Sequence, residues 1–349
     1  MPTNRCQETR RRVFNRLSTT DRGFCRGKCI AIILGAGCNI GAIPNCRMPS
    51  WSELLKMISQ EPGKIDHTRY LETAGRVEAE FLERSRKKVC EQFSRLGLIM
   101  SEDAIDATVR PDVSQRIARY VRLALKRGIK NPGDSVVPNS TMDCLISACV
   151  KRIQENLRTI VVTYNYDDLF ECKLLDRVRM ENIPHGDEIV RSASGMLPDA
   201  TELICSGKNG PSVDIFYVHG RIPLFGGNPD NISDRIILSQ QSYDILSRNH
   251  LEFANQVQYV VQSGIPIVSI GFSLDDINFC RLRTDLHSNY RHLPPFYSLQ
   301  YCGSKDCVTC DPDVREKMDA RLRHIEMLKI QALPMPSNDL ANCFNAIFN

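Results

Sequence analysis

Short, continuous apolar runs separated by longer mixed stretches are the main pattern along the chain. Strands buried on both faces of a parallel sheet have this unbroken apolar pattern, whereas half-exposed strands alternate. Helical periodicity fills most of the intervals between the runs and also covers Val314–Met327. We therefore predict an α/β fold with a Rossmann-like, doubly wound parallel sheet. The predicted strands are Ile30–Leu34, Thr159–Thr163, Ile215–Val218, Ile265–Ile270, Pro295–Gln300 and Ile330–Leu333.

The stretch from Glu61 to Arg158 has a different pattern, with three helical segments and no strand. The segments are RYLETAGRVEAEFLERSRKKVCEQF, VSQRIARYVRLALKRG and MDCLISACVKRIQENL, and Lys130–Ser140 is the predicted loop between the last two. We interpret residues 61–158 as a helical module inserted into a domain that spans residues 30–349. The Gly-, Pro-, Ser- and Asp-containing span Asn182–Ser212 is predicted to be a long irregular connection.

Charge is unevenly distributed at the N-terminus. The chain of 349 residues has a formal net charge of only +4, which is too small to indicate nucleic-acid binding by the whole molecule. Residues 1–29 nevertheless form a basic arm, with Lys and Arg far outnumbering Glu8 and Asp21. Two interpretations stay open: a solvated helix, or a contact surface for nucleic acid, an acidic partner or a neighbouring subunit.

The 15 cysteines are scattered along the chain and follow a charged N-terminus without an apolar signal-peptide core. Reduced thiols in a cytoplasmic protein fit this pattern better than a disulfide framework. No apolar run approaches the roughly 20 residues of a membrane-spanning helix. Cys302, Cys307 and Cys310 are the densest group; we expect free thiols in a loop there, and zinc with a remote fourth ligand is the alternative.

A glycine pair follows the first predicted strand, in the sequence IILGAGCNIGAIP. Gly35 and Gly37 would let the backbone approach a phosphate at a helix start, although a purely steric turn also explains them. The next glycine is Gly41, which gives the spacing G-A-G-x-x-x-G, and no acidic residue follows about 20 positions later in a second strand. The pattern therefore disfavours an ordinary nicotinamide dehydrogenase.

Polar residues also follow other predicted strands. They are Asn165, Asp167, His219 and Ser273, in the segments VVTYNYDDLFE, FYVHGRI and VSIGFSLDDINF. Because open α/β sheets bind ligands at the carboxyl ends of their strands, these segments predict a ligand site.

The ordered motifs GAGCNIGAIP, TYNYD, VHG and GFSL resemble those of the sirtuins. They resemble still more closely the SIR2-like NAD-cleaving domains of bacterial anti-phage defence, as MPSWSELL, NYDDLFE and GFSLDDINF indicate. The resemblance covers the chain from Ile30 onward, except for the helical insertion. It implies a site for NAD, bound as substrate, with no metal expected.

The resemblance also implies roles for individual residues. Asn165 would hold the ribose and a water at the reacting carbon, and His219 would act as general base, a role that suits an imidazole. Asp167 would orient this cluster. The implied NAD-binding residues are Gly35, Ala36, Gly37, Asn39, Arg47, Asp167, Gly271 and Ser273.

Three departures from the sirtuin pattern bear on the site and its reaction. Asn39 stands where the family has serine, and in AIPNCR Cys46 replaces the aromatic residue that shields the nicotinamide pocket of deacylases, while Arg47 is retained. The interval Gly220–Gly271 also lacks the paired cysteines of the deacylase zinc module. The loss of the aromatic residue and the missing zinc module disfavour a deacylase.

Structural roles compete with these assignments. Asn165 is a good N-cap for a helix beginning at Tyr166–Asp168, and His219 could be a satisfied core histidine. Ser273 and Asp276 have capping-box spacing, so Ser273 is expected to cap a helix, with Asp275 and Asp276 as helix-start charges. Cys38 and Cys46 are either redox-sensitive thiols or small buried hydrophobes.

The resemblance implies an NAD⁺ hydrolase that releases nicotinamide and ADP-ribose, or a cyclic form, as the effector of abortive defence. Such an activity must be gated, by formation of a homo-oligomer or by a partner such as a HerA-type ATPase or an Argonaute. Two alternatives are an NAD-dependent protein deacylase and a non-catalytic sensor of NAD or ADP-ribose. Membrane association is not expected, and direct contact with nucleic acid stays open.

Overall fold

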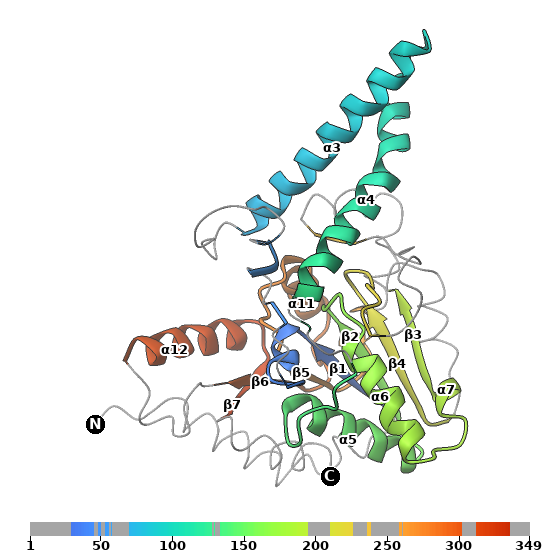
Figure 1. Ribbon diagram of the computed structural model, residues 1–349. Helices are drawn as coiled ribbons and strands as arrows, with labels where there is room; N and C mark the ends of the chain where they lie inside the picture. The colour runs from blue at the N-terminus through green and yellow to red at the C-terminus, as the bar shows by residue number, and fades with distance from the viewer. Residues whose placement is uncertain are drawn as a thin grey trace.

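A seven-stranded, entirely parallel sheet forms the centre of the protein (Figure 1). The strands are β1 (Cys29–Leu34), β2 (Arg158–Thr163), β3 (Val190–Ser194), β4 (Ser212–Tyr217), β5 (Ile267–Ile270), β6 (Phe296–Tyr301) and β7 (Gln331–Met335). The computed structural model describes residues 29–44, 48–49, 53–55, 57, 70–127, 129, 133–194, 210–225, 236–238, 258–259, 261–301 and 312–335.

The strand order is β3-β4-β2-β1-β5-β6-β7. From β1 the chain first builds the sheet outward through β2 to β4, with β3 outside β4, and then returns to the other side of β1 through β5, β6 and β7. The direction of winding therefore reverses between β1 and β5. This is the doubly wound arrangement that the apolar runs predicted, and the Rossmann-like α/β class is confirmed.

One face of the sheet is covered by α5 (Thr141–Gln154) and α6 (Leu169–Met180). Leu145 and Cys149 of α5 and Leu174 of α6 pack on strand residues such as Ile32 and Val161. Ser140 caps α5, because its side chain accepts the backbone N–H of Asp143 at 3.2 Å. Of the helices predicted between Glu61 and Arg158, α5 thus lies directly against the sheet.

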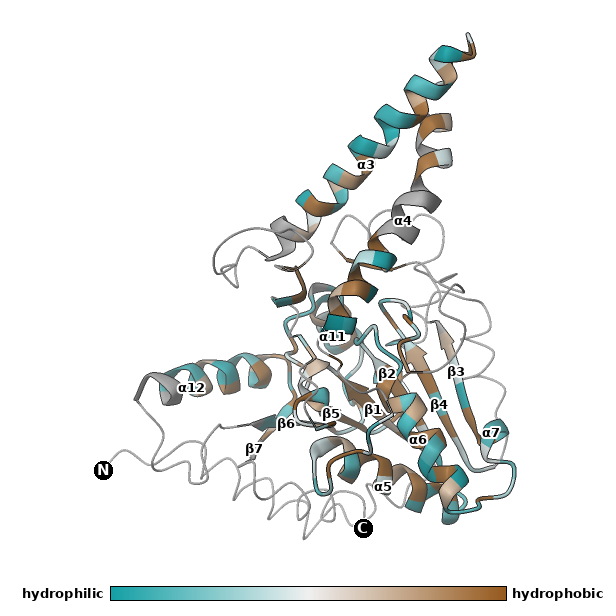
Figure 2. Ribbon diagram, viewed as in Figure 1, coloured by the Kyte–Doolittle hydropathy of each residue, from teal (hydrophilic) through white to brown (hydrophobic). Residues whose placement is uncertain are grey.

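The opposite face is covered by α11 (Ile277–Asn289) and α12 (Pro312–Met327). Phe279 of α11 and Leu322 and Ile325 of α12 pack against the other set of strand side chains, including Ile33 and Val162. Figure 2 shows the resulting division, with hydrophobic strands at the centre and hydrophilic outer helix faces. Side chains of consecutive strand residues point to opposite faces of the sheet. Because helices cover both faces, the runs are apolar throughout.

Two long helices, α3 (Tyr70–Arg95) and α4 (Glu102–Arg127), lie side by side and project away from the sheet (Figure 1). The structure begins α4 well before Val113, where the predicted helical segment starts. At the base of this α3–α4 hairpin, Val77 and Val121 belong to a buried cluster that includes Tyr166 and Ile222, which follow β2 and β4. The hairpin base therefore packs against the loops at the carboxyl edge of the sheet.

The span Asn182–Ser212 was predicted to be irregular, and this is wrong in part. It contains a short helix, α7 (Gly186–Ile189), and the edge strand β3, which pairs with β4 along its length. The β3 sequence, VRSAS, has no apolar run because an edge strand is only partly covered. The other predicted strands are present.

Several predictions fall outside the described residues. They concern the basic arm up to Lys28, Cys46 and Arg47 of the first loop, and the group Cys302, Cys307 and Cys310. They stay predictions, as do the proposed domain boundaries.

Candidate functional site

The candidate site lies where the winding of the sheet reverses. The loops that follow β1 and β5 emerge side by side there, and the loops after β2 and β4 are next along the same edge. Doubly wound sheets leave a crevice at such a point, outside the carboxyl ends of the strands. All the predicted site residues that the structure describes lie on these four loops.

The loop after β1, residues 35–41 (the glycine loop), contacts the loop after β5 through backbone atoms. The Gly35 amide donates to the Ile270 carbonyl at 3.1 Å, and the Gly37 amide donates to the Gly271 carbonyl at 2.9 Å. A Cβ atom on Gly35 would lie 2.5 Å from the Gly271 oxygen, and one on Gly37 would lie 2.8 Å from the Gly271 Cα. These glycines therefore have a steric role, because the two loops could not otherwise approach so closely.

Gly271, in the loop after β5, is the partner of Gly35 and Gly37 in this close backbone contact. Its φ of +62° lies in the left-handed region, and a Cβ atom there would collide with the Cys38 nitrogen. Ala36 and Gly37 are half-buried and Ser273 is exposed, so this junction retains solvent-facing surface for a ligand. The phosphate-binding role of these residues stays a prediction.

Asn39, Asp167 and Asn165 form one buried polar cluster beside the glycine loop. The Asn39 side-chain amide donates to the Asp167 carboxylate at 2.9 Å, which joins the loops after β1 and β2. The Asn165 amide lies 3.6 Å from the Cys38 sulfur, and the Cys38 thiol lies 3.3 Å from the Asn39 oxygen. Three of the predicted residues are thus brought together, with Cys38 between two of them.

Burial dominates the protonation of this cluster. It raises the pKa of the Asp167 carboxyl from 3.8 to about 7, because desolvation outweighs the hydrogen bonds from Leu169 and Asn39. Burial also raises the pKa of the Cys38 thiol well above its usual value, and the nearby Asp167 carboxylate adds to the shift. Cys38 is therefore a protonated, buried thiol, which favours the interpretation as a small hydrophobe.

His219 follows β4 and lies in an aromatic setting. Its imidazole meets the Tyr164 ring edge-on, with centroids 5.2 Å apart, and lies 5.8 Å from the Tyr166 ring. The His219 carbonyl accepts the Ile237 amide at 3.0 Å, and the Tyr166 hydroxyl donates to the Ile237 carbonyl at 2.5 Å. Its Nε2 atom lies 3.3 Å from the Asp276 carboxylate.

Asn165 and His219 therefore have different side-chain neighbours. Asn165 is buried, and its neighbours in the sequence are Tyr164 and Tyr166. The rings of these two tyrosines flank His219. The Asn165 amide contacts Cys38, whereas the imidazole contacts Asp276. The structure places both residues at one edge of the sheet, in the loops that follow the neighbouring strands β2 and β4.

The predicted capping role of Ser273 is wrong, and the alternative capping role of Asn165 is not found. Helix α11 begins at Ile277 and its N-cap is Asp276, which accepts the Phe279 amide at 2.8 Å; Ser273 does not cap it. Leu274 has a left-handed φ of +61°, so the chain cannot enter a helix at Ser273. Asn165 is not an N-cap either, because α6 begins after Asp168.

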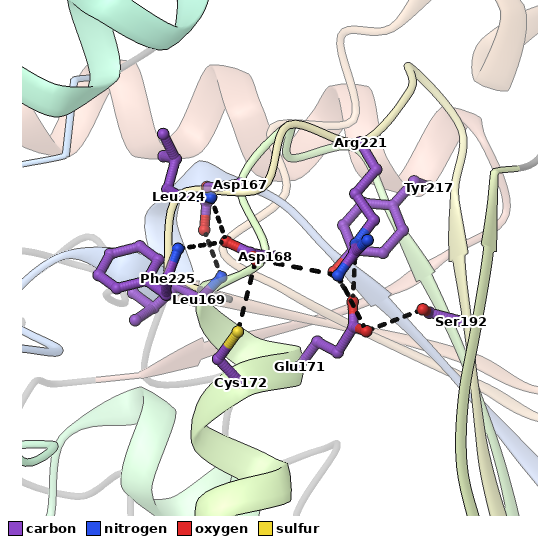
Figure 3. Close-up of polar contacts among 10 residues, drawn as sticks. All are labelled: Asp167, Asp168, Leu169, Glu171, Cys172, Ser192, Tyr217, Arg221, Leu224 and Phe225. Carbon is purple, nitrogen blue, oxygen red and sulfur yellow. Dashed lines mark hydrogen bonds and ion pairs between the residues drawn. The ribbon is translucent and has the colours of Figure 1, made fainter. Parts of the chain in front are cut away.

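A second, partly buried polar network joins the loops after β2 and β4 to α6 and β3 (Figure 3). The Glu171 carboxylate accepts two bonds from the Arg221 guanidinium at 3.0 and 3.2 Å, and single bonds from Ser192 and Tyr217 at 2.8 Å each. Asp168 lies 3.8 Å from Arg221. Its carboxylate also accepts the backbone amides of Leu224 and Phe225 at 2.8 and 3.0 Å.

This network ties the His219 loop to the Asn165 loop. Arg221 lies two residues after His219, and Asp168 lies three residues after Asn165. Sequence reasoning missed Glu171 and Arg221, and it treated Asp276 only as a helix-start charge. The contacts of these three residues join segments far apart in the chain, so one sequence does not reveal them. The only signal in the sequence was that each residue lies close to a motif residue.

Residues 159–325 match the family model of the SIR2-like domain. The chain contains a SIR2-like domain. The matched range begins in β2 and ends within α12, so it includes Asn165, Asp167, His219, Gly271 and Ser273. The glycine loop precedes this range in the chain, and the sheet joins it to the SIR2-like domain through the β1–β2 and β1–β5 pairings.

SIR2-like domains bind NAD, so the family indicates an NAD-related activity for this chain. No curated protein matches it closely enough to add a more specific activity. Within the described ranges, no three His, Cys, Asp or Glu side chains are grouped so that they could hold a metal ion. None of the helices in the described part combines the length and the apolar character needed to cross a membrane.

Proposed function

We propose that this protein is an NAD⁺ hydrolase that cleaves the bond between nicotinamide and ribose. The observation that carries the proposal is the position of Asn165 and His219 in the SIR2-like domain. They follow neighbouring strands at one edge of the sheet, next to the point where the winding reverses. Doubly wound sheets bind dinucleotides at that point.

The chemistry needs polar groups around the ribose more than it needs a strong acid. Nicotinamide leaves as a neutral molecule when the electron pair of the glycosidic bond passes to its ring nitrogen, and the ribose becomes oxocarbenium-like. In the proposed mechanism, Asn165 holds the ribose and a water, His219 takes a proton as the water attacks, and the product is ADP-ribose. Buried Asp167 and Asn39 hold the Asn165 loop against the glycine loop.

We further propose that the enzyme is the cytoplasmic effector of an abortive anti-phage defence and that its activity is gated. The α3–α4 hairpin is the proposed contact for a second copy of the chain or for a partner such as a HerA-type ATPase or an Argonaute. At its tip Leu96, Leu98 and Ile99 are exposed. Its base packs with Tyr166, whose ring lies beside His219, which gives a physical route from the hairpin to the site.

A protein deacylase is the second candidate, because sirtuin deacylases and SIR2-like hydrolases use the same kind of NAD site. A deacylase would release nicotinamide only in the presence of an acylated peptide. A non-catalytic NAD sensor would bind NAD without releasing nicotinamide. The absence of cysteine between Gly220 and Gly271 favours hydrolysis over deacylation, since the deacylase zinc module has no counterpart there.

Chromatography of NAD incubated with the full chain separates these functions. The chain is assayed over a range of protein concentrations, because oligomer formation is one proposed gate, and with and without an acetylated lysine peptide. A hydrolase releases nicotinamide and ADP-ribose in equal amounts without peptide. Release that depends strictly on the peptide contradicts hydrolysis and supports the deacylase.

A further inference from the structure

We infer that Asp276 is a positioning residue for His219, and that it fixes which imidazole nitrogen accepts a proton. This inference rests on the proposed function, because it concerns the base of that reaction. Asp276 comes from the loop after β5, whereas His219 follows β4, so the contact joins two strands that are not neighbours in the sheet. This role goes beyond the helix-start charge that the sequence predicted for Asp276.

The two oxygens of Asp276 have separate partners. Oδ1 accepts the Phe279 amide at 2.8 Å and so caps α11, while Oδ2 lies 3.3 Å from Nε2 of His219. Both side chains are 13% exposed, so little water competes for this contact. A carboxylate can only accept a hydrogen bond, so the neutral imidazole that acts as a base carries its proton on Nε2 and keeps its lone pair on Nδ1. Nδ1 is therefore the nitrogen that acts as the base.

An aromatic frame holds both partners in place. Tyr164 meets the His219 ring edge-on and stacks on Phe272 with centroids 4.3 Å apart. Phe272 in turn meets Phe279 at 5.3 Å, and Phe279 is the residue whose amide Asp276 caps. The frame therefore runs from the imidazole to the start of α11. Because the ring and the carboxylate share this support, their contact is built into the fold rather than being a chance approach on a mobile surface.

The hydroxyl groups of the two flanking tyrosines form hydrogen bonds away from the His219 ring. Tyr164 donates its hydroxyl to Gln258 at 2.7 Å, and the Tyr166 hydroxyl donates to the Ile237 carbonyl. Both tyrosines therefore offer His219 a ring face or edge while their hydroxyls bond elsewhere. The Asp276 carboxylate is a charged group that the structure places against the imidazole. This is the arrangement by which a buried carboxylate sets a histidine tautomer in other enzymes.

Asp276→Asn tests the inference with little change in shape. Asparagine is as good an N-cap as aspartate, so α11 keeps its cap. Its NH₂ group would face Nε2 and favour the opposite tautomer, with the proton on Nδ1. Asp276→Ser also keeps a capping oxygen and removes the carboxylate. Its shorter side chain does not place a donor against Nε2, as the NH₂ group of asparagine does. The matched control is Asp275→Asn, because Asp275 is the exposed neighbouring carboxylate.

Two readouts are measured on the full-length chain: the tautomer of His219, by nitrogen-15 NMR of the imidazole, and the steady-state kinetics of nicotinamide release. We expect the proton on Nε2 in the wild type and on Nδ1 in Asp276→Asn. We expect kcat to fall about 10- to 1,000-fold in Asp276→Asn and Asp276→Ser, with KM changed less than about threefold. Asp275→Asn should match the wild type in both measurements.

The two readouts separate this inference from the proposed function. If the tautomer changes as expected but neither the wild type nor any variant cleaves NAD at any protein concentration or with a candidate partner added, the positioning role stands and the hydrolase proposal fails. If the wild type cleaves NAD while Asp276→Asn keeps its rate, the positioning role is wrong. An unchanged tautomer in Asp276→Asn overturns the inference whatever the activity.

Discussion

The backbone amide of Gly37 donates to the carbonyl of Gly271 at 2.9 Å, and this contact joins the loops after β1 and β5. The two residues are distant in the chain and belong to two of the motifs that carry the family resemblance. Their closeness shows why the motifs occur together: each loop needs a glycine so that the other can pack against it. The geometry of the candidate site depends on this junction.

Gly271→Ala should destabilise the protein by a few kcal/mol, because the new Cβ would collide with the backbone of the glycine loop. Gly41→Ala is the matched control. Gly41 has a similar left-handed φ of +68°, but a Cβ there would meet nothing within 4 Å. The control should therefore cost only about 1 kcal/mol. Urea unfolding measures both, and equal losses would show that the loops do not need their close approach.

Asp167→Asn should remove a pH dependence from the free energy of unfolding. Burial raises the pKa of Asp167 from 3.8 to about 7, so folding favours its protonated form. The contribution of Asp167 to the free energy of unfolding is therefore fully present below about pH 4 and is lost as the pH rises through 7. At about 1.4 kcal/mol per unit, the wild type should lose on the order of 4 kcal/mol relative to the variant over this range.

Unfolding by urea at several pH values between 4 and 8 checks this expectation. Asp187→Asn is the control, because Asp187 is an exposed carboxylate that pairs with Arg179. Its difference from the wild type should stay nearly constant over the same range. A constant difference for Asp167→Asn as well would mean that the Asp167 carboxylate ionises normally in the folded protein.

Glu171→Gln should lower the free energy of unfolding by about 2–3 kcal/mol, because it leaves the Arg221 guanidinium without its main counter-charge. Arg221 is 28% exposed, which keeps the loss below that of a fully buried pair. The exposed Glu80–Arg84 pair offers a control, and Glu80→Gln should cost less than about 0.5 kcal/mol. Similar small losses for both variants would refute a structural role for the network in Figure 3.

Cys90 should react with iodoacetamide in the folded protein while Cys38 and Cys149 do not. Cys90 is exposed, whereas the other two are buried. Burial raises the pKa of the Cys149 thiol to about 12 and that of Cys38 further, so neither forms the reactive thiolate near neutral pH. Mass spectrometry of native and urea-treated samples gives the sites. Labelling of native Cys38 as fast as Cys90 would instead support a redox-sensitive thiol beside the site.

The apolar runs predicted the central strands because a strand buried on both faces leaves a continuous signature in the sequence. The edge strand β3, with the sequence VRSAS, has no such signature, and its pairing with β4 identifies it only in three dimensions. The start of α11 was also misplaced, since the left-handed Leu274 that delays the helix is not a glycine, asparagine or aspartate.

The site was predictable to the extent that its residues follow strands. Asn165, Asp167 and His219 were found because the end of an apolar run can be read from one segment at a time. The contacts between segments could not be found in this way. Asn39 with Asp167, and His219 with Asp276, join loops whose relation depends on strand order, which a single sequence does not contain.

The rate of nicotinamide release by Asn165→Ala and His219→Ala tests the central claim most directly. Asn289→Ala and His292→Ala are the matched controls, because they remove the same side chains from exposed positions. We predict that each site variant loses at least about 100-fold in kcat. The control variants should keep the wild-type rate. Unchanged nicotinamide release by either Asn165→Ala or His219→Ala would contradict this account of the site.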